Sequence, residues 1–385
     1  MLVQQARLGG KWIACNCRGS RVPSPILTPA FLSEAETYYL RRLTSGNRSE
    51  HHSDCPFYRD QATNRITHVR CRHAPADPAT AYFSALRPTP ERLAQRPESG
   101  AVDDRTRHAS LPRLARLLWR LINLADLNRC QARRLETSPS ITSQFKSLLS
   151  ATRTIEVAPG IELARVFSTH PQALRSRSVF AKLRAMEDHW PAGHAPQAFL
   201  ALFAHRIRGA TLHVADGPPL TLANRIQSPS IVDNRIGGPY LVLILVGQYP
   251  DTCGYAALRG YAQPIYSGRR FIPVETALER DAIRSLLSVR TLLDRNAIDL
   301  HMEKSLFDIL TPFGSCRPSL LLEARSRRSG ECRQLAVDLC ETRPETASNI
   351  SDQAHIMTTA NTLTIMADDL EQSRLVRRLA IALDL

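Results

Sequence analysis

The stretch VETALERDAIRSLLSV, residues 274–289, decides the fold of the last third of the chain. Its apolar residues recur at three- and four-residue spacing, which is the period of an amphipathic helix. They are Ala277, Leu278, Ala282, Leu286 and Val289. Three short apolar segments follow at residues 297–302, 318–324 and 333–339, and glycine or proline turns separate them. This spacing predicts a helix followed by three strands.

The pattern continues beyond these strands. It predicts a helix over residues 351–360, a strand over 362–366 and a closing helix over 368–385. The order is therefore α-β-β-β-α-β-α, and we expect an α/β domain over residues 266–385.

The middle of the chain, residues 111–265, mixes helix and strand patterns. Its longest apolar run, YLVLILV at residues 240–246, lies between Gly-Gly-Pro and a glycine and predicts a buried strand. A bilayer span needs about 20 apolar residues, so the run is too short to cross a membrane. Other patterns predict helices over residues 111–125, 176–187 and 196–204, and strands over 154–157 and 210–214. The expected fold class is α+β, with mixed α/β elements.

The N-terminal side of the chain has a different composition. Residues 1–73 carry four cysteines and several histidines, whereas residues 74–110 are rich in proline and charge and predict a linker. The first residues lack the apolar stretch and cleavage site of a secretory signal, so we expect a cytoplasmic protein with no membrane partner. In a reducing compartment its nine cysteines are expected to be thiols or metal ligands.

The net charge of +14 favours a polyanionic partner, DNA or RNA, because phosphate neutralisation supplies most non-specific nucleic-acid affinity. Lysine accounts for four of the 50 basic residues, which leaves 46 arginines (50 minus 4). Such a ratio is also typical of a GC-rich coding bias. The sequence lacks a G-x-x-x-x-G-K-[ST] loop, which excludes P-loop nucleotide hydrolysis.

The N-terminal cysteines have a spacing suited to a structural zinc ion. Cys15 and Cys17 lie one residue apart, and Cys55 follows His52 by three residues. Three thiolates and one imidazole form a closed tetrahedral site. The long loop between the two halves does not exclude the site, because loop-closure entropy grows only logarithmically with length.

The fourth zinc ligand is ambiguous from the sequence. The predicted ligand is His52, and His51, Cys71 and His73 compete with it, while His68 is a weaker candidate. Two other interpretations stay open. The thiols can be ordinary reduced cysteines, or Cys55 can act as a nucleophile with a neighbouring histidine as its base.

Five short motifs resemble a bacterial family called domain of unknown function 1173. They are CNC at residues 15–17, HHSDCPF at 51–57, LLWRLINLADLN at 117–128, EKSLFDI at 303–309 and RPSLLLE at 317–323. The resemblance implies that the three N-terminal cysteines of that family fall on Cys15, Cys17 and Cys55. It implies no activity.

The C-terminal order of elements resembles the restriction-endonuclease-like fold with its PD-(D/E)xK motif. In such nucleases carboxylates bind Mg²⁺ and a lysine assists the attacking water. The resemblance places the helix acid at Glu275 or Glu279. It places Ser319 where the Asp after Pro is expected, and Asp338 and Cys340 at the acid and the lysine of the second half-motif. Serine and cysteine are poor replacements, because Mg²⁺ prefers carboxylate oxygens and Cys340 has no positive charge.

Three hypotheses follow, and the sequence leaves open whether the protein is an enzyme. The first is a zinc-stabilised, non-catalytic protein that associates with nucleic acid. The second is a divalent-metal-dependent nuclease with a rearranged site formed by Glu279, Asp338 and Glu341. The third is a protein-interaction module that presents the apolar stripes of the helix beginning at Leu111 and of the helix at 375–383 to partners.

Overall fold

The structure of the protein is a computed structural model. It describes residues 2–18, 24–32, 37–42, 55, 57, 82, 83, 85, 86, 112–136, 138–215, 217–229, 236–248, 254–311, 314–340 and 361–383. The chain forms two compact units, Met1–Cys71 and Arg72–Leu385, and each is described by itself.

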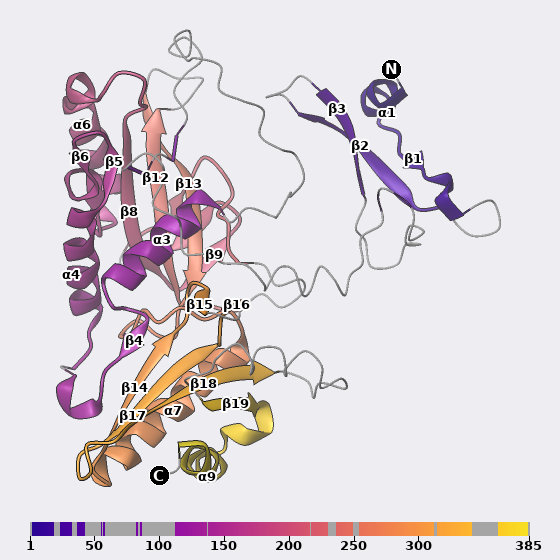
Figure 1. The fold of residues 1–385 in the computed structure, drawn as a ribbon. Helices are drawn as coiled ribbons and strands as arrows, with labels where there is room; N and C mark the ends of the chain where they lie inside the picture. The colour runs from indigo at the N-terminus through magenta and orange to yellow at the C-terminus, as the bar shows by residue number, and fades with distance from the viewer. Residues whose placement is uncertain are drawn as a thin grey trace. The chain divides into compact units, whose positions relative to one another are not determined.

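The described residues of the first unit form a short helix and a small sheet (Figure 1). Its elements are α1 (Leu2–Leu8), β1 (Ile13–Ala14), the 3₁₀ turn η1 (Asn16–Arg18), β2 (Ile26–Leu32) and β3 (Thr37–Arg42). The strands are antiparallel in the order β1-β2-β3, and Leu27 of β2 is buried. Strand β2 is therefore the middle strand of the sheet, and α1, which has no buried residues, adds little to a core.

The middle of the second unit is built on a four-stranded sheet in the order β13-β12-β8-β7. The strands are β7 (Phe167–Ser168), β8 (Gln197–Ala204), β12 (Tyr240–Gln248) and β13 (Tyr255–Pro264), and helix α3 (Arg113–Leu124) packs on β12 and β13. The interior positions of β12 are fully buried, so the prediction of a buried strand at 240–246 is confirmed. Trp119 of α3 donates a 2.8 Å hydrogen bond to Gln263 of β13, which joins helix and sheet.

One predicted helix in the middle region is wrong. Residues 196–204 form strand β8, which pairs with β12 along almost its whole length. The segment QAFLALFA is apolar on nearly every residue, and a fully buried strand in a sheet covered on both faces has no alternating pattern that would distinguish it from a buried helix.

The remaining elements of the middle region surround this sheet. The helices are α4 (Ile141–Ala151), α5 (Gln172–Arg175) and α6 (Ser178–Ala185). The 3₁₀ turns are η3 (Arg133–Leu135), η4 (Thr152–Thr154), η5 (Leu163–Val166) and η6 (Glu187–His189). The short strands are β5 (Glu156–Ala158), β6 (Ile161–Glu162), β9 (Arg206–Arg208), β10 (Thr211–His213) and β11 (Leu220–Thr221). The predicted helices at 111–125 and 176–187 and the predicted strands at 154–157 and 210–214 are confirmed, with ends shifted by a few residues.

Part of the predicted linker is packed against this core. Phe83 donates a backbone hydrogen bond of 2.7 Å to Glu156, and the backbone of Ala85 donates one of 3.1 Å to the side chain of Gln197. A Cβ atom on Gly247 would lie 2.3 Å from Leu86, so this glycine leaves room for that leucine. The four described residues of the segment therefore belong to the folded unit and not to a free linker.

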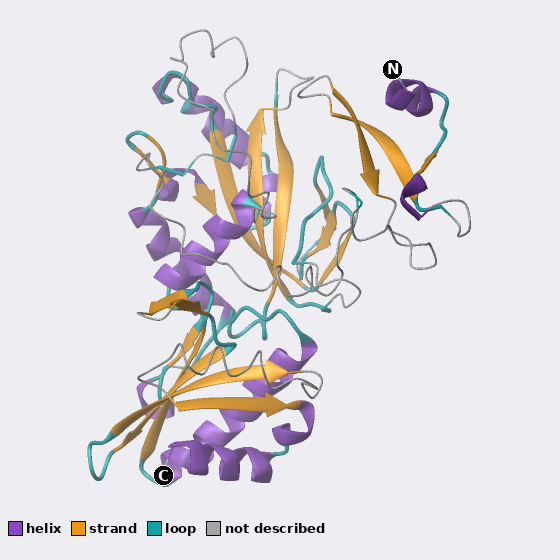
Figure 2. Cartoon of the chain, turned by 45° about the vertical axis from the view of Figure 1, so that its right-hand side comes forward, coloured by secondary structure: helices purple, strands orange, loops and turns teal. Residues whose placement is uncertain are grey.

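The C-terminal part combines helices and strands (Figure 2). It contains α7 (Ala277–Arg295), β14 (Ile298–Lys304), β15 (Ile309–Thr311), β16 (Gly314–Cys316), β17 (Leu320–Ser326), β18 (Cys332–Cys340), β19 (Asn361–Met366), η7 (Ala367–Leu370) and α9 (Gln372–Leu383). The helix predicted at 274–289, the three strands after it and the strand at 362–366 are present with shifted ends, and two short strands between them were not predicted. Strands β14, β17 and β18 are antiparallel and β19 is parallel to β18. The predicted helix at 351–360 lies outside the described residues. The closing helix starts later than predicted, because η7 comes first and ends before α9.

A fifth strand of the C-terminal sheet comes from the middle of the sequence. Strand β4 (Arg129–Cys130) pairs with β14, and the sheet order is β19-β18-β17-β14-β4. Asn128 and Lys304 exchange two further hydrogen bonds, of 2.8 and 2.9 Å. This contribution was not predicted, and it ties the middle region to the C-terminal core.

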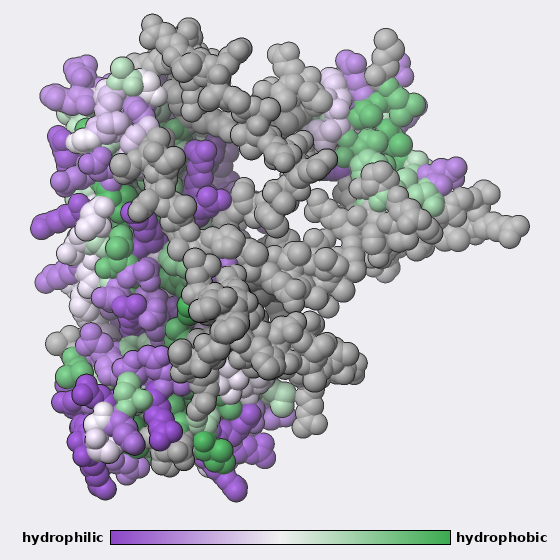
Figure 3. All heavy atoms as spheres, in the orientation of Figure 1, coloured by the Kyte–Doolittle hydropathy of each residue, from purple (hydrophilic) through white to green (hydrophobic). Residues whose placement is uncertain are grey.

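The apolar stripes of the third hypothesis face inward. Leu117, Leu118 and Leu121 of α3 are buried in the middle core, while Leu375 and Leu379 of α9 are buried against α7 and the C-terminal sheet. These stripes therefore do not support a protein-interaction module. On the surface drawn in Figure 3, hydrophilic residues dominate the edge formed by α4 and α6. Among the described helices, none has the length and apolar character that a membrane crossing requires.

Candidate metal centre and nuclease-like site

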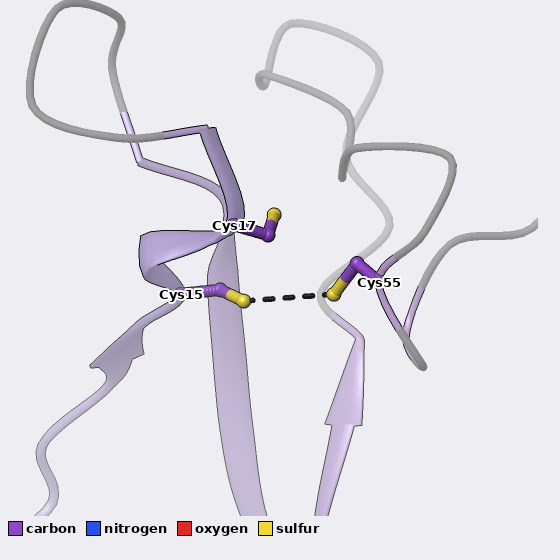
Figure 4. A group of neighbouring side chains, drawn as sticks. All are labelled: Cys15, Cys17 and Cys55. Carbon is purple, nitrogen blue, oxygen red and sulfur yellow. Dashed lines mark hydrogen bonds between the residues drawn. The ribbon is translucent and has the colours of Figure 1, made fainter.

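Three cysteine side chains of the first unit converge on one point (Figure 4). Cys15 follows β1, Cys17 lies in η1, and Cys55 faces them from a separate segment. The backbone of Cys15 donates a 2.7 Å hydrogen bond to Pro25, next to β2. The turn η1 then places the thiols of Cys15 and Cys17 on the same side, so both can bind the same ion (Figure 4).

The sulfur geometry fits a metal ion. The Sγ atoms of Cys15 and Cys55 are 3.7 Å apart, and all three sulfur atoms lie within 4.8 Å of one another. Zinc–sulfur bonds of about 2.3 Å in a tetrahedron separate two sulfur atoms by about 3.8 Å. The three thiols could therefore hold a metal ion after small adjustments. All three are half-buried, and none of them forms a disulfide in the described residues.

The surroundings of the thiols also bear on metal binding. Burial raises the pKa of the Cys15 thiol, and the neighbouring sulfur atoms of Cys17 and Cys55 raise it further. Three thiolates placed this close repel one another, and a bound cation offsets that repulsion. In the part of the chain that the structure describes, no other group of three Cys, His, Asp or Glu side chains can share a metal ion.

The structure leaves the fourth ligand untested. His52, His51, His68, Cys71 and His73 all lie outside the described residues. The assignment of His52 stays a prediction.

Glu279 of the C-terminal domain takes part in hydrogen bonds at a helix start and in a buried ion pair. It occupies the first turn of α7, where Thr276 accepts a 3.0 Å hydrogen bond from the backbone of Glu279 and Glu279 accepts one of 2.7 Å from the backbone of Glu275. These two hydrogen bonds satisfy backbone donors at the start of the helix. The other oxygen of Glu279 lies 2.7 Å from Nζ of Lys304.

The pair of Glu279 and Lys304 is almost completely buried, at 8% and 3% side-chain exposure. Lys304 ends strand β14 and was not predicted as a site residue. One signal could have identified it, because it is one of only four lysines in a chain that otherwise uses arginine. A buried ion pair of this kind neutralises the carboxylate that a nuclease would offer to Mg²⁺.

Ser319 and Asp338, the two positions expected to correspond to the PD-(D/E)xK motif, are neighbours across β17 and β18. The backbone of Ser319 donates a 3.3 Å hydrogen bond to Asp338, and the Ser319 hydroxyl accepts one of 3.2 Å from the backbone of Leu339. Burial raises the pKa of Asp338, although the Ser319 amide and the charge of Lys304 act in the opposite direction. Lys304, the ion-pair partner of Glu279, is thus also close enough to Asp338 for its charge to act on that carboxyl group. Glu341, the third predicted catalytic residue, lies outside the described residues.

The fold and these two clusters define an α+β protein with a restriction-endonuclease-like C-terminal domain and an N-terminal cysteine cluster that could hold a metal. Three family models match parts of the chain. Residues 275–382 match the restriction endonuclease-like C-terminal domain, residues 75–265 match a domain of unknown function (DUF8535), and residues 1–61 match a domain of unknown function (DUF8534).

These matches confirm the predicted likeness of the C-terminal region to restriction endonucleases. They do not confirm the resemblance to domain of unknown function 1173. No curated protein and no solved structure matches the chain.

Proposed function

We propose that the protein binds nucleic acid without cleaving it, and that zinc held by Cys15, Cys17 and Cys55 stabilises its N-terminal unit. In this proposal residues 1–73 carry the metal, with His52 as the fourth ligand. Residues 266–385, together with β4, form the nuclease-like part.

The buried pair of Glu279 and Lys304 carries the non-catalytic part of the proposal. A divalent ion at Glu279 would have to displace a lysine that is 97% buried from a 2.7 Å contact. Ser319 supplies no carboxylate, so Asp338 is the one acid at the two strand positions of the motif that the structure describes. A single carboxylate is a weak Mg²⁺ site without substrate oxygens to complete it.

Two observations support nucleic acid as the partner. The C-terminal domain matches a restriction endonuclease-like model, and the chain carries a net charge of +14. A positively charged protein releases counterions when it binds the phosphate backbone, so its affinity depends steeply on salt. We expect the affinity of the full chain for a DNA duplex to fall by at least about tenfold between 50 and 200 mM salt. Undetectable or salt-independent binding would contradict the proposal.

The match to the endonuclease-like domain favours a second candidate, a nuclease that uses Glu279, Asp338 and Glu341. Incubation of plasmid DNA with the protein and Mg²⁺ or Mn²⁺ separates the two candidates. The first predicts intact plasmid with the wild-type protein and with Asp338→Ala. Cleavage by the wild-type protein that is lost in Asp338→Ala would establish the nuclease instead.

The metal is tested by elemental analysis of the purified full chain. We expect one zinc ion per chain in the wild-type protein and its loss in the Cys15→Ser, Cys17→Ser variant. Cys332→Ser is the matched control, because Cys332 is an exposed cysteine of the C-terminal domain outside the cluster. Equal zinc content in all three proteins, or none in the wild type, would contradict the zinc assignment.

A further inference from the structure

A cavity of about 620 Å³ lies in the middle region, between helices α5 and α6 on one side and strands β11 and β13 on the other. Three arginines line it: Arg175, Arg177 and Arg184. None of the residues that line it belongs to the cysteine cluster or to the nuclease-like site. Its size is within the range of about 300 to 1,000 Å³ that small-molecule sites occupy.

Arg175 is held in place by the chain on one side of the cavity. Its Nη2 atom donates a 2.7 Å hydrogen bond to the carbonyl of Pro218, and its guanidinium lies against the backbone of Gly217. A Cβ atom at Gly217 would lie 2.9 Å from Nη1 of Arg175, so a larger residue at this position would displace the guanidinium. Within the described part of the protein, the Nε atom of Arg175 is buried and has no hydrogen-bond partner. The guanidinium of Arg175 is therefore held in position by Pro218, and its Nε–H group is available to donate a hydrogen bond to a ligand.

The other two arginines lie on one face of α6. Arg177 caps the helix with a left-handed backbone conformation, φ 59°, and Arg184 follows it by seven residues, which is two helical turns. Phe180 and Ala181 lie between them on the same face, three and four residues after Arg177. All four residues line the cavity, and both arginines are exposed. This wall thus combines two positive charges with an aromatic ring.

The first residues of strand β13 form the opposite wall of the cavity. Tyr255, Ala256 and Ala257 supply one ring and a small apolar surface. Burial and, to a smaller extent, the Glu187 carboxylate raise the pKa of Tyr255 to about 12, although the charge of Arg184 acts in the opposite direction. The phenol is therefore neutral at pH 7, and Arg184 and Glu187 are close enough to Tyr255 to influence it. Residues of α6 and of β13 line the same cavity.

We propose that this cavity binds a nucleoside phosphate, with the phosphate held by Arg175, Arg177 and Arg184 and the base lying against Phe180 and Tyr255. Guanidinium groups bind phosphate through charge-assisted hydrogen bonds, and aromatic rings stack on bases of any sequence. The proposal rests on the proposed function and names a site for it, since the nucleoside phosphate can be the end of a single strand or a free nucleotide.

The test uses the full chain and a fluorescein-labelled, 5′-phosphorylated oligothymidylate, with binding followed by anisotropy. Arg184→Gln removes one cavity charge. Arg177→Asn removes another while keeping a residue type that tolerates the left-handed conformation. Lys182→Gln is the charge-matched control, because Lys182 lies on α6 but does not line the cavity. We expect each arginine variant to weaken binding about tenfold and the control to change it less than about twofold.

Competition with adenosine monophosphate and with inorganic phosphate identifies the ligand. Displacement by adenosine monophosphate, at concentrations where phosphate has no effect, supports the nucleoside phosphate. Equal displacement by phosphate alone refutes recognition of the base. If the wild-type protein binds the oligonucleotide and both arginine variants bind it as well, the cavity proposal fails and the proposed function stands. If the protein binds adenosine monophosphate through the arginines but no nucleic acid, the cavity proposal stands for the free nucleotide and the proposed function fails.

Discussion

The substitution Glu136→Gln removes a negative charge that two buried arginines share. Arg270 donates two hydrogen bonds to the Glu136 carboxylate, and Nη1 of Arg290 lies 2.7 Å from Oε2 of Glu136. The three side chains are only 17%, 14% and 8% exposed, in the order Glu136, Arg270 and Arg290. Glutamine keeps the shape of the side chain, so the variant leaves two guanidinium groups in place without their counter-charge.

The expected loss follows from this burial. Breaking a buried ion pair by removing one partner costs about 3 to 5 kcal/mol. Glu136 keeps a little solvent contact, so we expect the lower end, about 3 kcal/mol of unfolding free energy, and a Tm lower by about 6 °C. Glu303→Gln is the matched control, because Glu303 pairs with Arg129 at 32% and 49% exposure. Such an exposed pair contributes less than about 1 kcal/mol.

The loss should also depend on pH. Burial alone raises the pKa of Glu136, but the hydrogen bonds and charges of Arg270 and Arg290 outweigh burial and lower it from its ordinary 4.5. A carboxyl group with a lowered pKa stabilises the fold fully above its ordinary pKa and loses that contribution as the pH falls through its folded pKa. The stability difference between the wild type and Glu136→Gln should therefore be constant above about pH 5 and shrink below pH 4.5.

The assay is thermal and urea unfolding followed by tryptophan fluorescence, since Trp119 is buried in the middle core and reports on its loss. A Tm for Glu136→Gln that equals that of Glu303→Gln would refute the reasoning. So would a stability difference that grows as the pH falls.

Two further predictions concern the C-terminal domain. Burial raises the pKa of Asp338, so the ionised carboxylate destabilises the fold at neutral pH. In urea unfolding at pH 7, Asp338→Asn should therefore be more stable than the wild type by up to about 1 kcal/mol, and this gain should vanish as the pH falls to the ordinary pKa of 3.8. A variant less stable than the wild type would contradict this prediction. A fragment of residues 266–385 lacks β4, and its thermal unfolding followed by circular dichroism should be broad and non-cooperative. A fragment of residues 112–385 contains β4 and should unfold cooperatively. Equally cooperative unfolding of both fragments would show that β4 is dispensable.

Elements with a strong local pattern were predictable from the sequence. The helix α7 was recognised from its amphipathic period, whereas β12 and the short strands after α7 were recognised as apolar runs bounded by glycine or proline. Strand β8 was mistaken for a helix because its residues are apolar without alternation. Strand β4 left no trace at all, since a two-residue strand exists only through its pairing with β14.

In the candidate sites too, residues marked by a local sequence pattern could be predicted, and contacts set only by tertiary packing could not. The C-x-C spacing of Cys15 and Cys17 pointed to a pair of thiols, and the distance to Cys55 could be bridged because long loops cost little to close. The contact of Lys304 with Glu279 depends on how β14 lies against α7, and no local pattern encodes that arrangement. Tertiary packing therefore decides which acids of the C-terminal domain are available to a metal.

The pairing of β4 with β14 also has a consequence for the order in which the chain folds. Arg129 and Glu303, which face each other in this pairing, are separated by 174 positions, so the C-terminal sheet cannot be completed by local contacts. We expect the middle core to form first and to hold β4 ready as a template for β14, because closing so long a loop from two unstructured ends slows folding. Pulse-labelled hydrogen exchange would show this as early protection in β12 followed by later protection in β14, and simultaneous protection would argue against it.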